Sequence, residues 1–284
     1  MRNSGVLLLG ASGRLGRMVQ AFWPSETELI CHGRSARPGY ISFDPLSDAE
    51  ALCAAMAGRR AVLCLSGVTP AHAAASGDPL SLNVALALAA VRAAGRAGVP
   101  RLLLASSAAV YGAAEGPLNE DMNCDPVSEY GHAKLQMEKQ ALAAAEVCDQ
   151  AVTMLRIGNV AGADAILGGW KEGMQLDVLP DGTTPARSYI GPRSFSHAIH
   201  RLCTAEDLPG VLNLAAPGVV HMGALLDAAD RPWMTRDAGP AAIARVELES
   251  KRLEKLVEFA PNAGTAQGLV AEWRAYLAQP ESDQ

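Results

Sequence analysis

Short, mostly apolar runs alternate with longer amphipathic segments along the first part of the chain. The runs at 6–9, 61–65, 102–105 and 152–157 are typical of strands buried on both faces of a sheet, and 28–35 and 40–44 are shorter strand candidates. Helical periodicity occupies the intervals at about 15–22, 48–56 and 78–97, and begins again near 128. This alternation predicts an α/β fold with a doubly wound parallel sheet and right-handed crossovers.

The regular alternation fades after residue 162. Residues 163–187 contain several glycines, Trp170, Pro180 and Asp181-Gly182, which indicate a loop-rich segment. A helix at 194–203, a last strand at 211–214 and helices around 221–229, 250–258 and 266–277 follow. We therefore expect a dinucleotide-binding domain over 1–162 and a small C-terminal substrate lobe over 163–284, with segments around 188–215 returning to the core.

Composition narrows the class of protein. The chain has 284 residues, of which 49% are hydrophobic and 19% charged, so a sizeable core can form. A net charge of −6 without a basic stripe argues against a nucleic-acid partner. The sequence shows no signal-peptide pattern and no apolar run of membrane-spanning length, and its six cysteines are scattered without a C-x-x-C pair. We expect a cytoplasmic protein that acts on a small molecule and does not bind membranes.

A glycine-rich stretch follows the first apolar run. Gly10, Gly13 and Gly16 recur every third residue, where the strand turns into a helix. Glycine permits the tight turn and the close approach of a bound group, and the free N–H groups at the helix start attract phosphate. The spacing differs from the common G-x-G-x-x-G dinucleotide motif, and a purely structural turn is the alternative. In this strand–turn–helix context, the stretch predicts the pyrophosphate site of a dinucleotide.

The end of the second strand bears on the choice of cofactor. An acidic residue at this point holds the adenosine 2′-hydroxyl of NAD, whereas an arginine accommodates the 2′-phosphate of NADP. This chain has Arg34 there, followed by Arg37, and Arg14 lies within the glycine turn. The arginines favour NADP over NAD, and three solvated surface arginines are the alternative interpretation.

Hydroxyl, phenol and amine groups form the candidate chemistry. Ser106 and Ser107 lie at the carboxyl end of a predicted strand, where doubly wound sheets bind their ligands. Tyr130 and Lys134 are four residues apart on one helix face. A tyrosine titrates near ~10 when free, and a neighbouring lysine cation and an oxidised nicotinamide would favour its phenolate form. Tyr130 could then exchange a proton with a substrate whose oxygen is hydrogen-bonded by Ser107, which is chemistry suited to interconverting a carbonyl and an alcohol.

Several segments together resemble the extended short-chain dehydrogenase/reductase family, which includes nucleotide-sugar epimerases, dehydratases and reductases built on a Rossmann fold. The matching segments are the three glycines, Asn83-Val84, and residues 106–112, 130–134 and 156–162. The resemblance implies Ser107, Tyr130 and Lys134 as catalytic residues, Asn159 and Arg187 as residues that reach the substrate, and a homodimer. The predicted cofactor-binding residues are Gly10, Ser12, Gly13, Arg14, Leu15, Gly16, Arg34, Asp44, Leu65, Asn83, Tyr130 and Lys134.

Departures from the family pattern limit what the resemblance implies. Ala108 and Ala109 stand where dehydratases carry an acidic pair, which disfavours dehydration, and residues 191–194 lack the usual acidic motif. The predicted lobe is also short for a bulky substrate. His197 and His200 have no evident third ligand, so no metal site is predicted.

These observations lead to a first functional hypothesis, an NADP-dependent oxidoreductase interconverting a carbonyl and a secondary alcohol on a sugar-like or nucleotide-sugar substrate. The alternatives are an NAD-dependent nucleotide-sugar epimerase and a non-catalytic NADP-binding regulator.

Overall fold

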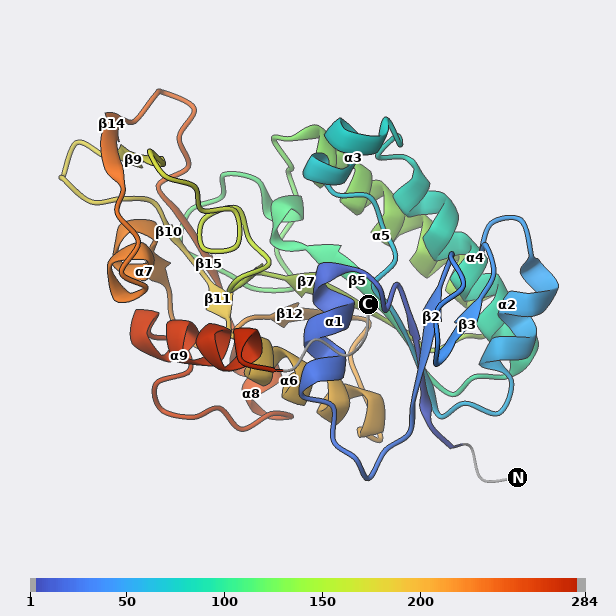
Figure 1. Ribbon diagram of the computed structural model, residues 1–284. Coiled ribbons are helices and arrows are strands. Elements are labelled where there is room, and N and C mark those ends of the chain that lie inside the picture. The colour runs from blue at the N-terminus through green and yellow to red at the C-terminus, as the bar shows by residue number, and fades with distance from the viewer. Residues whose placement is uncertain (1–3, 280–284) are drawn as a thin grey trace.

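A seven-stranded parallel sheet forms the centre of the molecule (Figure 1). The computed structural model describes residues 4–279. Strand order is β12-β7-β5-β4-β1-β2-β3, with helices on both faces, so the predicted doubly wound α/β fold is confirmed. The strands are β1 (Val6–Leu9), β2 (Leu29–Gly33), β3 (Tyr40–Ser42), β4 (Ala61–Cys64), β5 (Leu102–Ser107), β7 (Val152–Ile157) and β12 (Val211–Leu214).

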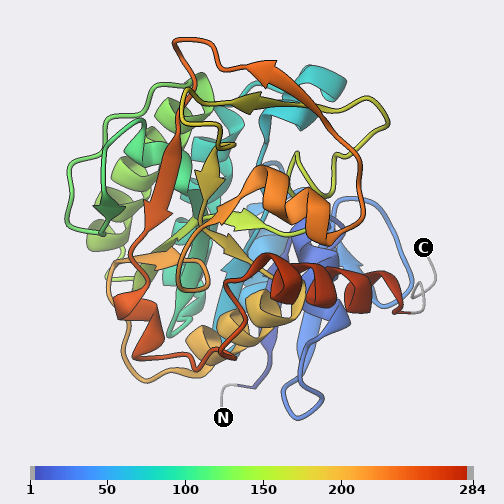
Figure 2. The ribbon, with the colours of Figure 1, turned by 90° about the vertical axis from the view of Figure 1, so that its left-hand side faces the viewer.

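Short strands and helices form a second layer beyond the carboxyl ends of the sheet (Figure 2). A four-stranded sheet has the order β13-β10-β15-β6, and the pairs β11-β8 and β14-β9 lie beside it. The strands are β6 (Pro117–Leu118), β8 (Asn159–Val160), β9 (Gln175–Val178), β10 (Ala186–Arg187), β11 (Tyr189–Ile190), β13 (Val220–His221), β14 (Met234–Asp237) and β15 (Arg245–Leu248). Helices α7 (Met222–Ala228) and α9 (Ala266–Leu277) pack together in this layer.

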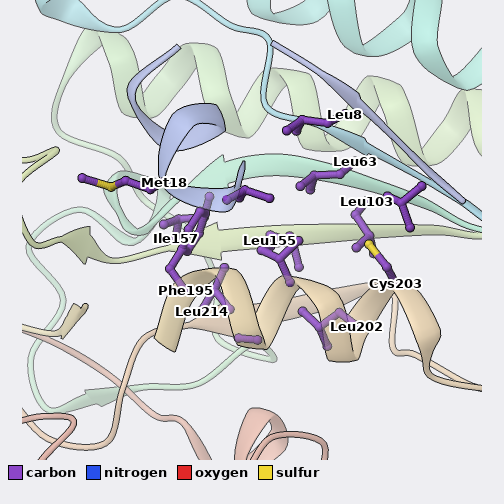
Figure 3. Packing of buried hydrophobic residues seen from close by; sticks show 14 of the residues in the cluster. Leu8, Met18, Leu63, Leu103, Leu155, Ile157, Phe195, Leu202, Cys203 and Leu214 are labelled. Atoms are coloured by element: carbon purple, nitrogen blue, oxygen red, sulfur yellow. The ribbon is translucent and has the colours of Figure 1, made fainter. Parts of the chain in front are cut away.

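The helices that cover the sheet are α1 (Arg14–Ala21), α2 (Ala49–Met56), α4 (Leu82–Ala97), α5 (Glu129–Val147) and α6 (Pro192–Thr204). Alternate side chains of each central strand enter two different cores between the sheet and these helices. Leu8 and Leu63 point toward α1 and α6, together with Leu103 and Leu155 (Figure 3). Leu7 and Leu9 instead face α2, α4 and α5. Burial on both faces explains why the strands are almost wholly apolar in sequence.

The structure corrects some predicted boundaries. The helix expected to start at residue 78 begins at Leu82, and a separate helix, α3 (Pro70–Ser76), precedes it. Ser81 is the N-cap of this helix, and the Asp78 carboxylate instead forms a 2.9 Å hydrogen bond with His72. The helix expected at 250–258 is reduced to α8 (Lys251–Glu254). Over the described residues, no helix is both long and apolar enough to cross a membrane.

The segment without the family's acidic motif forms a regular helix start. Gly191 is the N-cap of α6, and Pro192 occupies its first turn. The Ser194 hydroxyl and backbone N–H both donate to the Glu272 carboxylate of α9, at 2.6 and 2.8 Å. The Glu272 carboxylate of α9 therefore accepts hydrogen bonds from the first turn of α6, where backbone N–H groups lack partners within the helix.

Candidate active site

The glycine turn closes tightly against the loop after β4. Gly10 has a φ of +82°, and a Cβ added there would lie 2.8 Å from the Ser66 backbone nitrogen. A Cβ at Gly16 would lie 2.4 Å from the Gly10 carbonyl oxygen. Gly13 is the N-cap of α1 and offers no side chain to the helix start. The N–H groups of the first turn of α1 therefore lack a side-chain acceptor, an arrangement that suits a phosphate.

A groove of about 340 Å³ extends from this turn across the carboxyl ends of β1, β2 and β4. Half of the twelve residues predicted to bind the cofactor line it, namely Gly10, Ser12, Gly13, Arg34, Asp44 and Leu65. The groove also contains His72 and Asp78, which the sequence reasoning did not select. Their 2.9 Å hydrogen bond depends on the position of α3, which no sequence pattern indicated.

The other predicted cofactor residues lie outside the lining of this groove. Gly16 is buried in the turn, Leu15 packs against the core, and Arg14 is exposed at the start of α1. Asn83 is 1% exposed, and its side-chain amide is fully engaged with the backbone. It accepts from Val68 N at 3.1 Å and donates to the carbonyls of Val68 and Leu80 at 2.9 Å. Asn83 thus shapes the groove by holding the loop after β4.

Ser107, Tyr130 and Lys134 come together from β5 and α5. Lys134 Nζ donates to the Ala105 carbonyl at 2.9 Å and lies 5.9 Å from the centroid of the Tyr130 ring. Ser107, at the carboxyl end of β5, lies close enough to the Tyr130 hydroxyl to lower the pKa of that phenol. The three predicted catalytic side chains therefore occupy one site at the carboxyl end of β5.

Glycine at position 131 allows this assembly. A Cβ on Gly131 would lie 2.5 Å from the Ala109 carbonyl oxygen, in the short helix η1 (Ala108–Tyr111) that follows Ser107. Ser128 caps α5 by accepting from the Gly131 N–H at 3.0 Å. Gly131 therefore permits a close approach of α5 to the backbone of η1. It brings the first turn of α5 next to Ser107.

Burial favours the neutral forms of both ionisable groups in the site. It raises the pKa of the Tyr130 phenol, and the hydrogen bond with Ser107 opposes this shift. It lowers the pKa of the 4%-exposed Lys134 amine to about 8, against the influence of Cys64 and Glu138. Lys134 thus carries its charge at neutral pH and loses it under mildly alkaline conditions.

We expect turnover to fall as the pH rises through about 8, because Lys134 is cationic only below its pKa. The dependence of kcat/KM on pH reports ionisations of the free enzyme and is the quantity to measure. Lys134→Arg keeps its charge throughout this range and should lack that alkaline decline, whatever its absolute rate. If kcat/KM of Lys134→Arg still declined at alkaline pH as in wild type, the decline would arise from the ionisation of another group.

The two predicted substrate residues flank Tyr189 of β11. Asn159 of β8 pairs in register with Tyr189, and Arg187 of β10 lies two residues before it. The Arg187 guanidinium is half-buried and donates to the Ala186 carbonyl at 2.8 Å. Burial lowers the pKa of Arg187. No carboxylate forms a salt bridge with this guanidinium anywhere in 4–279, so an anion there would offset its desolvation.

Comparison with known proteins identifies the family. The NAD dependent epimerase/dehydratase family matches residues 6–182. A UDP-glucose 4-epimerase of Azospirillum brasilense is 33% identical over 173 residues, covering 56% of this chain and 50% of that protein. The chain thus spans about half the length of this curated relative.

Solved structures share the fold over almost the whole chain. MoeE5, solved in complex with UDP-glucose and NAD, has a TM-score of 0.76 at 23% identity, covering 97% of this chain and 100% of that one. UDP-glucose 4-epimerase from Bifidobacterium longum, solved with NAD+ and UDP, has a TM-score of 0.75 at 19% identity, covering 95% and 96%. The chain belongs to the NAD-dependent epimerase/dehydratase family of extended short-chain dehydrogenase/reductase enzymes.

Proposed function

We propose that this protein is an NAD-dependent nucleotide-sugar epimerase. The observation that carries the proposal is the assembly of Ser107, Tyr130 and Lys134 at the carboxyl end of β5, beside a groove that begins at a glycine turn. The matched relative is a UDP-glucose 4-epimerase, and the two solved neighbours were crystallised with NAD. These findings favour the epimerase over an NADP-dependent reductase, which the sequence alone had placed first.

The residues of the groove fit a dinucleotide. Gly10 and Gly13 leave room for a pyrophosphate, the first turn of α1 supplies N–H donors, and Asp44 and Leu65 line the groove further along. A bound nicotinamide would supply the hydride acceptor and donor that epimerisation requires.

Side chains of the protein transfer the proton of the substrate hydroxyl. Tyr130 takes the proton from the substrate hydroxyl and returns it after the configuration has changed. Ser107 donates a hydrogen bond to the substrate oxygen while it has carbonyl character. The Lys134 cation favours the phenolate that Tyr130 forms. The same three groups work in both directions, as an epimerase needs.

A phosphate-bearing substrate suits the charge at Arg187. Its half-buried guanidinium has no carboxylate partner among the salt bridges of the described residues. Arginine binds phosphate oxygens through paired N–H donors. We therefore assign Arg187 to a substrate phosphate and Asn159, on the other side of Tyr189, to the adjoining part of the substrate. The 1–162 and 163–284 division, a homodimer and a cytoplasmic location are parts of the same proposal.

Incubation with UDP-glucose or UDP-galactose and added NAD tests the function. The proposal predicts that each sugar nucleotide yields its isomer, with no net change in the amounts of NAD and NADH. Separation of the two isomers by chromatography is the measurement. Absence of isomers from these and from the corresponding dTDP-sugars, together with steady NADPH oxidation on a carbonyl substrate, would replace the epimerase with the reductase.

The reductase remains the second candidate because of the groove lining near β2. Gly33 ends β2 without a carboxylate, and Arg34 and Arg37 line the groove just beyond it. Such guanidinium groups can bind a 2′-phosphate. The third reading, a non-catalytic NADP-binding regulator, is disfavoured by the intact Ser107, Tyr130 and Lys134 assembly.

Arg34→Asp tests this part of the groove. We expect it to lower the ratio of NADP to NAD affinity at least tenfold, or about 1.4 kcal/mol, because it exchanges an attractive charge for a repulsive one. Calorimetric titration of both cofactors gives the ratio. Arg92→Asp, at an exposed position of α4 outside the groove lining, is the matched control. An unchanged ratio in Arg34→Asp would remove the structural argument for NADP.

A further inference from the structure

A buried ion pair lies directly behind the catalytic side chains. Glu138 of α5 is 2% exposed and Arg156 of β7 is 6% exposed. Arg156 Nη2 donates to Glu138 Oε2 at 2.8 Å, and Nε lies 3.2 and 3.3 Å from the two carboxylate oxygens. Burial alone would lower the pKa of Arg156, but its hydrogen bonds and the charge of Glu138 raise it above the usual value. The Arg156 guanidinium therefore keeps its charge beside Glu138.

The pair connects the two elements that carry the catalytic groups. Glu138 follows Lys134 by four residues, as Lys134 follows Tyr130, so the three side chains share one face of α5. Arg156 is in register with Ser106 of β5, which immediately precedes Ser107. The Ser106 hydroxyl also donates to Glu138 Oε1. One carboxylate thus fixes α5 to both β5 and β7.

The same arginine holds the segment on the other side of Ser107. Arg156 Nη1 donates to the Tyr111 hydroxyl at 3.0 Å, and that hydroxyl donates to Asn213 Oδ1 of β12 at 2.8 Å. Tyr111 ends η1, the short helix that Ser107 caps by accepting from the Ala109 N–H. Ser107 is therefore held through Ser106 before it and through Tyr111 after it.

Burial of charge is expensive, which argues that the pair does more than add stability. A buried ion pair can often be replaced by apolar residues of similar volume at no cost in stability. The Glu138 carboxylate also favours the cation of Lys134, one turn away on the same face, where burial disfavours it. The other titratable groups around Lys134 are Cys64 of β4 and Tyr130, with Arg156 on the far side of Glu138.

We propose that the Glu138–Arg156 pair is a positioning device that holds Tyr130 and Lys134 of α5 against Ser107 of β5. The inference rests on the proposed function, since both residues act through Tyr130 and Lys134 and neither touches the substrate. Its consequence is that the pair controls the proton affinity of Tyr130.

Spectroscopic titration of Tyr130 tests the proposal without any substrate. The near-ultraviolet absorbance of phenolate is followed against pH in the protein saturated with NAD, and Tyr130→Phe identifies the contribution of Tyr130. We expect Glu138→Gln to raise the pKa of Tyr130 by about one unit, a tenfold change in the phenolate-to-phenol ratio, because α5 no longer holds the phenol against Ser107, which favours the phenolate. Glu146→Gln, at an exposed position of the same helix, should leave the titration unchanged.

Turnover supplies a second readout. With UDP-glucose as the probe, Glu138→Gln should lower kcat about tenfold and leave KM within twofold, because the contacts to the substrate are retained. A KM increase with unchanged kcat would contradict a role through Tyr130.

A double variant separates positioning from simple stabilisation. Glu138→Leu with Arg156→Met removes both charges and approximately keeps the buried volume, so it should fold even if Glu138→Gln does not. We expect it to melt near the wild-type temperature and still show the raised pKa of Tyr130. Wild-type titration in the double variant would overturn the inference. If the protein converts no sugar nucleotide and every variant titrates like wild type, both the positioning role and the proposed function are contradicted. If the protein converts no sugar nucleotide but the pKa of Tyr130 shifts in the variants, only the proposed function is contradicted.

Discussion

Replacing Tyr130 with phenylalanine is expected to lower the rate of sugar-nucleotide epimerisation by about 10²–10⁴-fold. The substitution removes the hydroxyl that exchanges the substrate proton and keeps the ring that packs beside Lys134. Affinity for NAD should stay within about threefold, because no contact to the pyrophosphate is lost. Turnover measured with UDP-glucose, together with a calorimetric NAD titration, gives both quantities.

A second tyrosine provides the matched control for this experiment. Tyr276 of α9 is half-buried and lies against Phe22, outside the groove and the catalytic assembly. Tyr276→Phe should retain wild-type turnover. A Tyr130→Phe variant with turnover within a few-fold of wild type would rule out Tyr130 as the proton-exchanging group.

Gly10→Ala should both destabilise the protein and abolish measurable NAD binding. Its φ of +82° disfavours any residue with a Cβ, and that Cβ would lie 2.8 Å from Ser66 N and 3.0 Å from Leu65 C. Left-handed strain costs about 1–2 kcal/mol and overpacking about 1–3 kcal/mol. Thermal unfolding without cofactor measures the loss of stability, and NAD titration measures the loss of cofactor binding.

Gly13→Ala is the informative comparison for this variant. Gly13 has a φ of −74°, and an added Cβ meets only the Gly10 carbonyl oxygen, at 3.3 Å. We expect its unfolding temperature to stay close to that of wild type, while NAD binding weakens because the Cβ faces the groove. Equal unfolding temperatures for Gly10→Ala and wild type would contradict the close approach of the turn to the loop after β4.

Features that depend on neighbouring residues in sequence could be predicted without the structure. The runs at 152–157 and 211–214 match β7 and β12, because strands buried on both faces are largely apolar, here with Thr153, Arg156 and Asn213 as exceptions. The four-residue spacing of Tyr130 and Lys134 and the Ser128 cap follow from local helix geometry. The candidate catalytic residues could therefore be selected from local sequence patterns.

Features that depend on long-range pairing could not be predicted. Strands β8, β10, β11 and β13 have two residues each, too few to show a period. Asn83 was predicted to lie near the cofactor, but its hydrogen bonds to the loop after β4, which lines the groove, could not be predicted from sequence. The spacing of Lys134 and Glu138 was visible in the sequence, but the partner Arg156 follows from the register of β5 and β7. Such contacts are decided by tertiary packing and not by local propensity.

The most direct test of the central claim is the fate of a deuterium label at C4 of UDP-glucose during epimerisation. If hydride passes to the bound nicotinamide and returns to the same sugar, the UDP-galactose that forms keeps the deuterium at C4 by mass spectrometry and NMR, and Tyr130→Phe forms almost none. Loss of the label to solvent, or labelled product at the wild-type rate from Tyr130→Phe, would contradict the account.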